Sequence, residues 1–98
     1  MQVLVIARIV EGVSIEQVQL YISAEAAAVW NSYTEDMLRT IHYIADMSGA
    51  VLLFEAPSVA AIEAVMPKFP MIANGLLKCE VIALKPYVGL ASLFAQPQ

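Results

Sequence analysis

The stretch Arg39–Glu55, RTIHYIADMSGAVLLFE, predicts two β-strands joined by a tight turn at Asp46–Gly49. Successive side chains of a strand point to opposite faces, so we expect Arg39 and Tyr43 on one face and His42 on the other. Most of the reactive side chains of the chain therefore lie on this hairpin or on the helix expected before it.

The segment Gln2–Val10 is almost continuously apolar, which is typical of a central strand that is covered on both faces. Helices of the same chain can cover one face. In so short a chain we expect a second copy of the protein to cover the other. Arg8 interrupts the run, and two interpretations stay open: a strand-end residue that reaches solvent, or a clamp for an anion at the mouth of a cleft.

Capping signals predict the helices between this strand and the hairpin. Ser14 and Gln17 match a capping box, so a short helix is expected over 15–21. Ser23 is the expected N-cap of a second helix over 24–36. The apolar stripe of that helix, at i, i+3, i+4, i+7 and i+11, is expected to comprise Ala26, Val29, Trp30, Tyr33 and Met37.

The chain after the hairpin repeats the pattern of a helix followed by a strand. Ser58 is the expected cap of a helix that Pro67 and Pro70 end, and Leu76–Lys85 is the expected last strand. The tail, residues 86–98, is too apolar to be left in water. We therefore expect it to pack on a neighbouring subunit.

The order strand, helix, strand, strand, helix, strand is that of the ferredoxin-like βαββαβ unit, an α+β fold. Right-handed crossovers predict a four-stranded antiparallel sheet in the order 4-1-3-2, with both main helices on one face. The other face is mostly apolar. We therefore expect residues 1–98 to form a single domain whose sheet packs against that of a second copy, as a dimeric α/β barrel.

The composition supports this expectation. Of the 98 residues, 60% are hydrophobic and 14% are charged, whereas typical domains carry about 45–50% apolar and about 25% charged residues. So small a chain cannot bury that much apolar surface alone, which indicates a subunit interface or a ligand cavity. No uncharged apolar run approaches the roughly 20 residues of a membrane-spanning helix. The N-terminal segment lacks the basic start of a signal peptide, and the single Cys79 fits a reducing, cytoplasmic location.

Charge and motifs exclude several classes of function. The net charge is −4, and the five basic residues are scattered singly, so no nucleic-acid partner is expected. The sequence has no phosphate-binding glycine loop and no metal-ligand spacing of His or Cys. We therefore expect neither a cofactor nor a metal.

Over residues 23–86 the chain resembles the muconolactone-isomerase-like group of the dimeric α/β-barrel superfamily. The resemblance rests on AEAAAVWNSY, LRTIHYIAD, SGAVLLFEA, FPM and GLLKCEVIALKP, which contain Glu25, Trp30, Tyr33, Arg39, Tyr43, Asp46, Gly49, Glu55, Phe69–Met71, Gly75, Glu80 and Pro86. It implies a dimer or larger ring, with a pocket between sheet and helices. The isomerases, as we align them, have a second glutamate at the position of Ala24 and a Trp-Arg pair at His42-Tyr43.

Proton transfer beside a carbonyl needs a base, a hydrogen-bond donor for the enolate oxygen and a clamp for a carboxylate. Glu25, Tyr43 and Arg39 are the candidates for these three roles. Glu25 can alternatively be a solvated capping carboxylate. Trp30 and Tyr33 either belong to the core or form the walls of the pocket.

His42 and Cys79 are the two remaining candidate side chains. His42 and Asp46 are about 13 Å apart along a regular strand, so they cannot touch. His42 is either a structural residue at the sheet interface or a pocket residue whose partner comes from elsewhere, such as Glu80 or a second subunit. Cys79 has no basic companion on its own face and is expected to be a small buried hydrophobe.

These features support two hypotheses for function. The first is a cofactor-independent isomerase or lyase-type enzyme acting on a small, partly apolar, carboxylated lactone-like molecule. The second is a non-catalytic module that binds a small ligand or serves oligomerisation. Haem or quinone oxygenase chemistry occurs among related barrels, and the single histidine argues against it.

Overall fold

Four strands form one antiparallel sheet in the order β2-β3-β1-β4, which is the predicted order. The computed structural model describes residues 1–95. The strands are β1 (Gln2–Ile9), β2 (Leu38–Tyr43), β3 (Gly49–Glu55) and β4 (Leu77–Ala83). The predicted hairpin is therefore confirmed as β2 and β3.

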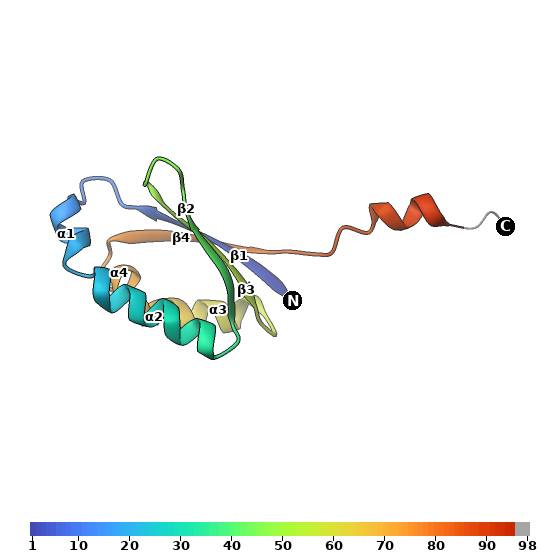
Figure 1. Ribbon diagram of the computed structural model, residues 1–98, viewed down its shortest axis with the longest axis horizontal. Coiled ribbons are helices and arrows are strands. Elements are labelled where there is room, and N and C mark those ends of the chain that lie inside the picture. The colour runs from blue at the N-terminus through green and yellow to red at the C-terminus, as the bar shows by residue number, and fades with distance from the viewer. Residues whose placement is uncertain (96–98) are drawn as a thin grey trace.

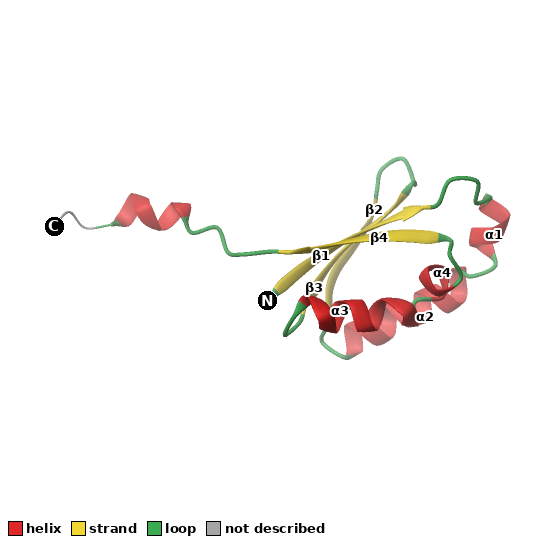
Figure 2. Cartoon of the chain, turned by 180° about the vertical axis from the view of Figure 1, so that it is seen from behind, coloured by secondary structure: helices red, strands yellow, loops and turns green. Residues whose placement is uncertain are grey.

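The helices lie on one side of the sheet, as Figures 1 and 2 show from opposite directions. They are α1 (Ile15–Gln19), α2 (Ile22–Thr34), α3 (Val59–Val65), the 3-10 turn η1 (Met66–Lys68) and the short α4 (Pro70–Ala73). This is the predicted α+β arrangement, with α2 and α3 as the two main helices.

Side-chain caps set the start of two helices. The N–H of Gln17 donates to Ser14 Oγ at 3.2 Å, and the N–H of Ser14 donates to Gln17 Oε1 at 2.8 Å, which completes the predicted capping box of α1. Ser58 caps α3 as expected. The prediction for α2 was wrong, because Tyr21 occupies the N-cap position and Ser23 falls inside the first turn. The chain turns from α1 directly into α2 at Tyr21, whose carbonyl accepts the N–H of Glu25 at 2.8 Å.

The core lies between the sheet and the helices. Val3 and Val5 of β1 and Phe54 of β3 are completely buried, and so is Ile62 of α3. Their neighbours in sequence point to the opposite face, as the two-residue period of a strand requires. The helices cover the face of the sheet that carries Val3, Val5 and Phe54.

The α2 helix is rotated relative to the predicted stripe. Val29 packs against the core and Ser32 is buried, whereas Trp30 is 65% exposed. Small residues therefore face the sheet, and the large ring of Trp30 lies on the outside of the helix. The expectation that Trp30 belongs to the core was wrong.

The face without helices carries a continuous apolar patch, as expected. In the strand register one row across the sheet runs through Thr40, Leu53, Leu4 and Ile82, and the next runs through His42, Val51, Ile6 and Glu80. The five aliphatic side chains in these rows are only partly buried. We call this surface, made by Leu4, Ile6, Val51, Leu53 and Ile82, the helix-free patch.

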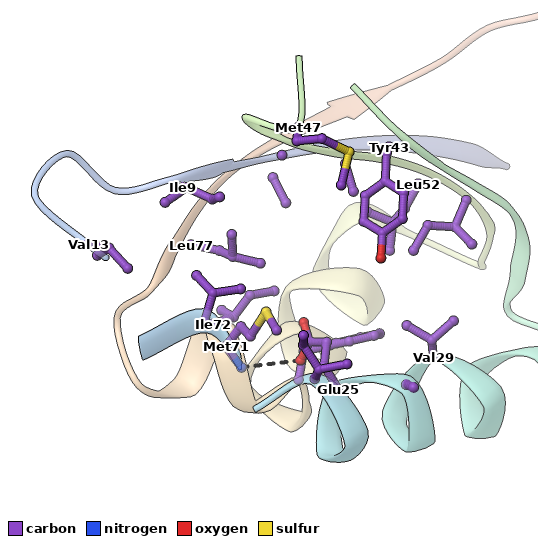
Figure 3. A pocket seen from close by; sticks show the side chains of 18 of the residues that line it. Ile9, Val13, Glu25, Val29, Tyr43, Met47, Leu52, Met71, Ile72 and Leu77 are labelled. Carbon is purple, nitrogen blue, oxygen red and sulfur yellow. Dashed lines mark hydrogen bonds between the residues drawn. The ribbon is translucent and has the colours of Figure 1, made fainter. Parts of the chain in front are cut away.

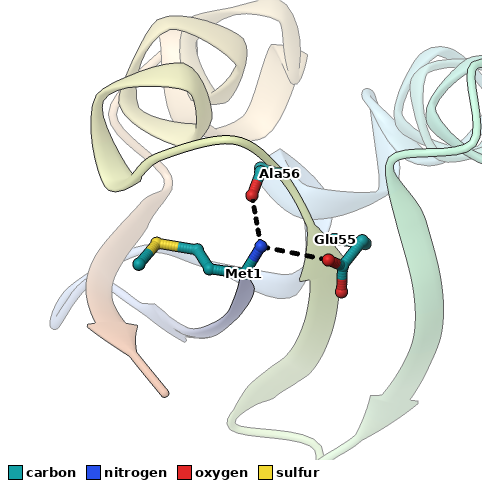
Figure 4. A network of polar contacts seen from close by, with 3 residues as sticks. All are labelled: Met1, Glu55 and Ala56. Carbon is teal, nitrogen blue, oxygen red and sulfur yellow. Dashed lines mark hydrogen bonds and ion pairs between the residues drawn. The ribbon is translucent and has the colours of Figure 1, made fainter. Parts of the chain in front are cut away.

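The first residue is fastened to the end of β3 (Figure 4). The ammonium group of Met1 donates to Glu55 Oε1 at 3.0 Å and to the carbonyl oxygen of Ala56 at 2.8 Å. The N–H of Ala56 in turn donates to the carbonyl oxygen of Met1 at 2.9 Å. These contacts hold β1 in register with β3 at the end of the sheet opposite the β2–β3 turn.

The tail extends away from the sheet and ends in the 3-10 helix η2 (Gly89–Phe94), which stands apart from the body in Figure 1. Tyr87, Leu93 and Phe94 are largely exposed. Packing of the tail on a neighbour stays a prediction, and residues 96–98 of it lie outside the described part. Within residues 1–95, no helix has the length and apolar character needed to span a membrane.

Candidate functional site

A cavity of about 640 Å³ lies between the helix-covered face of the sheet and helices α1, α2 and α4. Its walls are mostly aliphatic, and the sheet contributes residues such as Ala7, Leu52 and Leu77. Its polar residues are Ser14, Gln19, Glu25, His42 and Tyr43. The predicted pocket between sheet and helices is therefore present within a single copy of the chain, on the side away from the helix-free patch.

Glu25 is the acid of this cavity. It lies in the first turn of α2 and is half-buried. The backbone N–H of Met71, at the start of α4, donates to its Oε1 at 3.2 Å (Figure 3). Burial raises the pKa of Glu25, because a carboxylate loses hydration in an apolar wall, and the Met71 hydrogen bond opposes that rise. These conditions favour a carboxyl group that exchanges a proton.

Tyr43 reaches the cavity from the sheet at its open rim, since the residue is 76% exposed. It is the last residue of β2 and is paired with Ala50, whose own partner on β1 is the buried Ala7. This register places Tyr43 on the helix-covered face. In Figure 3 its ring extends into the cavity, with the hydroxyl on the side of Glu25.

The connection between α2 and β2 explains why Glu25 and Tyr43 line the same cavity. The helix and the strand run in opposite directions and are joined by a short turn, so the start of α2 lies at the same end of the fold as the end of β2. Arg39 is near the start of β2, which places it at the other end of the helix, about 13 Å along the strand from Tyr43.

A β-bulge further separates Arg39 from this site. The β2–β3 register shifts between Leu38 and Thr40, so the two residues 39 and 40 occupy the space of one in the alternation. Arg39 is exposed and does not line the cavity within the described chain. Of the three predicted catalytic residues, Glu25 and Tyr43 therefore line the same cavity and Arg39 does not.

The predicted pocket-lining residues divide in the same way. His42 borders the cavity, although its pairing with Val51 places it in the register of the helix-free face. Trp30, Tyr33 and Arg8 do not line the cavity in residues 1–95. Arg8 lies on the helix-free face opposite Lys78, and Trp30 and Tyr33 are exposed on the outer part of α2.

Sequence reasoning missed the wall formed by α1 and by the turn of the hairpin. Ile15, Ile22 and Met47 line the cavity and are also more than half exposed, so they form its apolar rim. The signal for this wall was present in the sequence, because a five-residue helix with an exposed isoleucine has no core of its own to cover. The contribution of the Met71 backbone had no such signal.

Cys79 lies close to the site without lining it. It packs against the core from β4, as expected for a small hydrophobe. Burial raises the pKa of its thiol, and the charge of Glu25 raises it further. The described residues also contain no group of three or more His, Cys, Asp or Glu side chains that could hold a metal ion.

Comparison with known proteins identifies solved structures that share this fold. No family model and no curated protein matches the sequence. Among solved structures, muconolactone isomerase matches with a TM-score of 0.70 and 21% identity over 91% of this chain and 93% of that chain. The 5-chloro-2-hydroxyhydroquinone dehydrochlorinase of Burkholderia phenoliruptrix AC1100, in complex with 2,5-dihydroxybenzoquinone, matches with a TM-score of 0.66 and 20% identity over 87% and 94%.

An antibiotic biosynthesis monooxygenase also matches, with a TM-score of 0.58 and 11% identity over 88% of this chain and 100% of that chain. Proteins with different reactions thus share the architecture, so fold alone does not identify the chemistry. The resemblance inferred from the sequence is confirmed at the level of fold: this chain has the βαββαβ fold of muconolactone isomerase.

Proposed function

We propose that this protein is a cofactor-independent enzyme that moves a proton within a small, lactone-like molecule. The observation that carries the proposal is the position of Glu25, half-buried in an apolar cavity of about 640 Å³ with the Tyr43 ring on the opposite wall. Cavities of this size accommodate a small organic molecule.

Each residue has a defined role in the proposed reaction. The ionised carboxylate of Glu25 takes a proton from the carbon beside the carbonyl group of the substrate. The electron pair of that C–H bond forms the C=C bond of the enolate, and the π pair of the carbonyl group moves to its oxygen. The Tyr43 hydroxyl donates a hydrogen bond to the resulting enolate oxygen. Protonated Glu25 then returns the proton to another carbon of the conjugated system, which completes an isomerisation without any change of oxidation state.

The structure supports two of the three catalytic roles expected from the sequence, those of the base and the hydrogen-bond donor. Arg39 was expected to clamp a carboxylate of the substrate, and it lies outside the cavity lining. The proposal therefore keeps the base and the donor and omits the clamp. The names of two structural relatives, an isomerase of a lactone and a dehydrochlorinase bound to a quinone, support a small ring-shaped substrate.

The test is exchange of carbon-bound hydrogen for deuterium in a panel of enol lactones, followed by NMR in D₂O. Glu25→Gln removes the base and is expected to lower the rate by about 10²–10⁴-fold. Tyr43→Phe removes the donor and is expected to cost about 10²-fold. Glu63→Gln, the same change on the exposed surface of α3, is the matched control. Equal rates in all four proteins would overturn the proposal. Ligand binding without turnover would instead favour the non-catalytic module.

The same proposal includes an assembly. The helix-free patch is apolar and uncovered in one copy of the chain, and the fold is that of dimeric α/β barrels. Packing of two such patches across a two-fold axis would cover both, because a two-fold interface uses the same surface of each subunit. The exposed tail is proposed to pack on the neighbouring subunit.

A further inference from the structure

We infer that the cavity selects an uncharged ligand and rejects the carboxylate form of the same molecule. The inference rests on the proposed function only in taking this cavity as the substrate site. Among the described residues that line the cavity, Glu25 is the acidic member, and none is a lysine or arginine. An anionic ligand would therefore lie beside a like charge with no permanently charged cation in the walls. His42 also borders the cavity, but its pairing with Val51 places it in the register of the helix-free face.

The positions of the five lysine and arginine side chains support this inference. Arg8 and Lys78 face each other on β1 and β4, on the helix-free side of the sheet. Arg39 lies near the start of β2, away from Glu25. Lys68 borders a separate cleft of about 100 Å³ beside α2 and α3. Lys85 follows the end of β4 and is exposed.

The helix ends at the cavity do not replace these missing cations. The start of a helix attracts anions through its free N–H groups and its dipole. Glu25 already occupies the first turn of α2, and its Oε1 accepts the Met71 N–H at the start of α4. The favourable charge of both helix starts is thus used by the protein's own carboxylate.

An anionic ligand would also disable the proposed base. Burial already raises the pKa of Glu25. A second negative charge in the cavity would raise it further, because like charges disfavour ionisation, and a smaller fraction of Glu25 would be in the ionised form that acts as the base. A neutral ligand avoids both costs. It can use the Tyr43 hydroxyl and the polar groups of Gln19 and Ser14 as hydrogen-bond partners.

The experiment compares two ligands that differ in one charge. A butenolide carrying a carboxymethyl group and the methyl ester of the same compound are titrated into the protein by calorimetry at neutral pH. We expect the ester to bind at least about 10-fold more tightly than the acid. In Glu25→Gln the difference in affinity between the ester and the acid is expected to become smaller, because binding of the acid improves when the like charge is removed. In the control Glu63→Gln the difference is unchanged.

Two results would overturn the inference. One is an acid that binds as tightly as the ester or more tightly. If Arg39→Ala then removed that preference, the clamp expected from the sequence would be operating. The other is failure of both the ester and a neutral apolar dye to bind. Because the readout is binding, absence of turnover with the ester preference intact would count against the proposed reaction alone.

Discussion

The backbone N–H of Met71 donates to Oε1 of Glu25 at 3.2 Å, and this contact joins the first turn of α2 to the first turn of α4. The partner of the carboxylate is thus a neutral backbone group and not a cation. A backbone donor stabilises the charged form of Glu25 less than burial destabilises it, since the pKa is raised overall.

This balance predicts how stability depends on pH. Between the ordinary pKa of a glutamate and the raised pKa of Glu25, the folded chain holds a proton that the unfolded chain has released. The free energy of unfolding therefore falls as the pH rises through this window and stays lower above it. Glu25→Gln, whose amide oxygen can still accept the Met71 N–H, is expected to lack this decline.

Urea unfolding at a series of pH values measures the effect. The wild type and Glu25→Gln should have similar stability at acid pH, and the variant should be the more stable protein at neutral pH. Glu63→Gln should retain the decline seen in the wild type. Parallel curves for the wild type and Glu25→Gln would contradict the environment described for this carboxylate.

A second prediction concerns the first residue of β3. A Cβ added at Gly49 would lie 1.9 Å from the carbonyl oxygen of Ala7, a backbone atom that cannot move without disturbing the β1–β3 pairing. Gly49→Ala is therefore expected to cost about 3 kcal/mol of unfolding free energy or more. The comparison is Gly75→Ala, where the space is open and only the positive φ of 74° opposes a side chain. That variant is expected to lose about 1–2 kcal/mol, and equal losses at the two positions would contradict the steric account.

The hairpin shows how far sequence reasoning reaches. The alternation of β3 and the apolar run of β1 predicted the strands, and right-handed crossovers predicted their order, which the structure confirms. The face of the sheet that the helices cover was left open, because both faces of β1 are apolar. The register of Arg39 was not predictable, because a bulge adds one residue to a strand without leaving a mark in the side-chain pattern. Trp30 was misplaced for a related reason. Helical spacing restricts a buried stripe to a range of angles, and here packing selected the small residues next to Trp30.

The shared cavity of Glu25 and Tyr43, and the separation of Arg39 from it, were open to prediction. The start of a helix and the end of an antiparallel strand joined to it by a short turn lie at the same end of the fold, so the chain order alone brings these two residues together. The α1 wall of the cavity and the Met71 donor depend on how short helices dock. That docking is decided by tertiary packing rather than by local pattern.

A third prediction tests the helix-free patch. Leu53 is near its centre, between Thr40 and Leu4 in the strand register. Leu53→Glu would place a charge in an apolar interface, where it would lose its hydration without a partner. The mass measured by light scattering is expected to fall to that of a single chain. Ala60→Glu puts the same charge on the exposed side of α3 and should leave the mass unchanged. A wild type that is already a single chain at micromolar concentration would contradict the assembly itself.

The last prediction concerns the tail. Tyr87, Leu93 and Phe94 are each more than 70% exposed in one copy of the chain, and burying a side chain of this kind contributes about 1.5–3 kcal/mol. Removal of residues 87–98 is expected to leave the circular dichroism spectrum of the α/β body unchanged, because η2 stands apart from it (Figure 1). The assembly should instead dissociate at a higher protein concentration than the intact protein does. A full-length variant with Leu93→Ser and Phe94→Ser should also dissociate at a higher protein concentration, because it loses the same apolar contacts with a neighbour as the truncated protein does. Unchanged dissociation in both proteins would show that the tail contributes nothing to assembly.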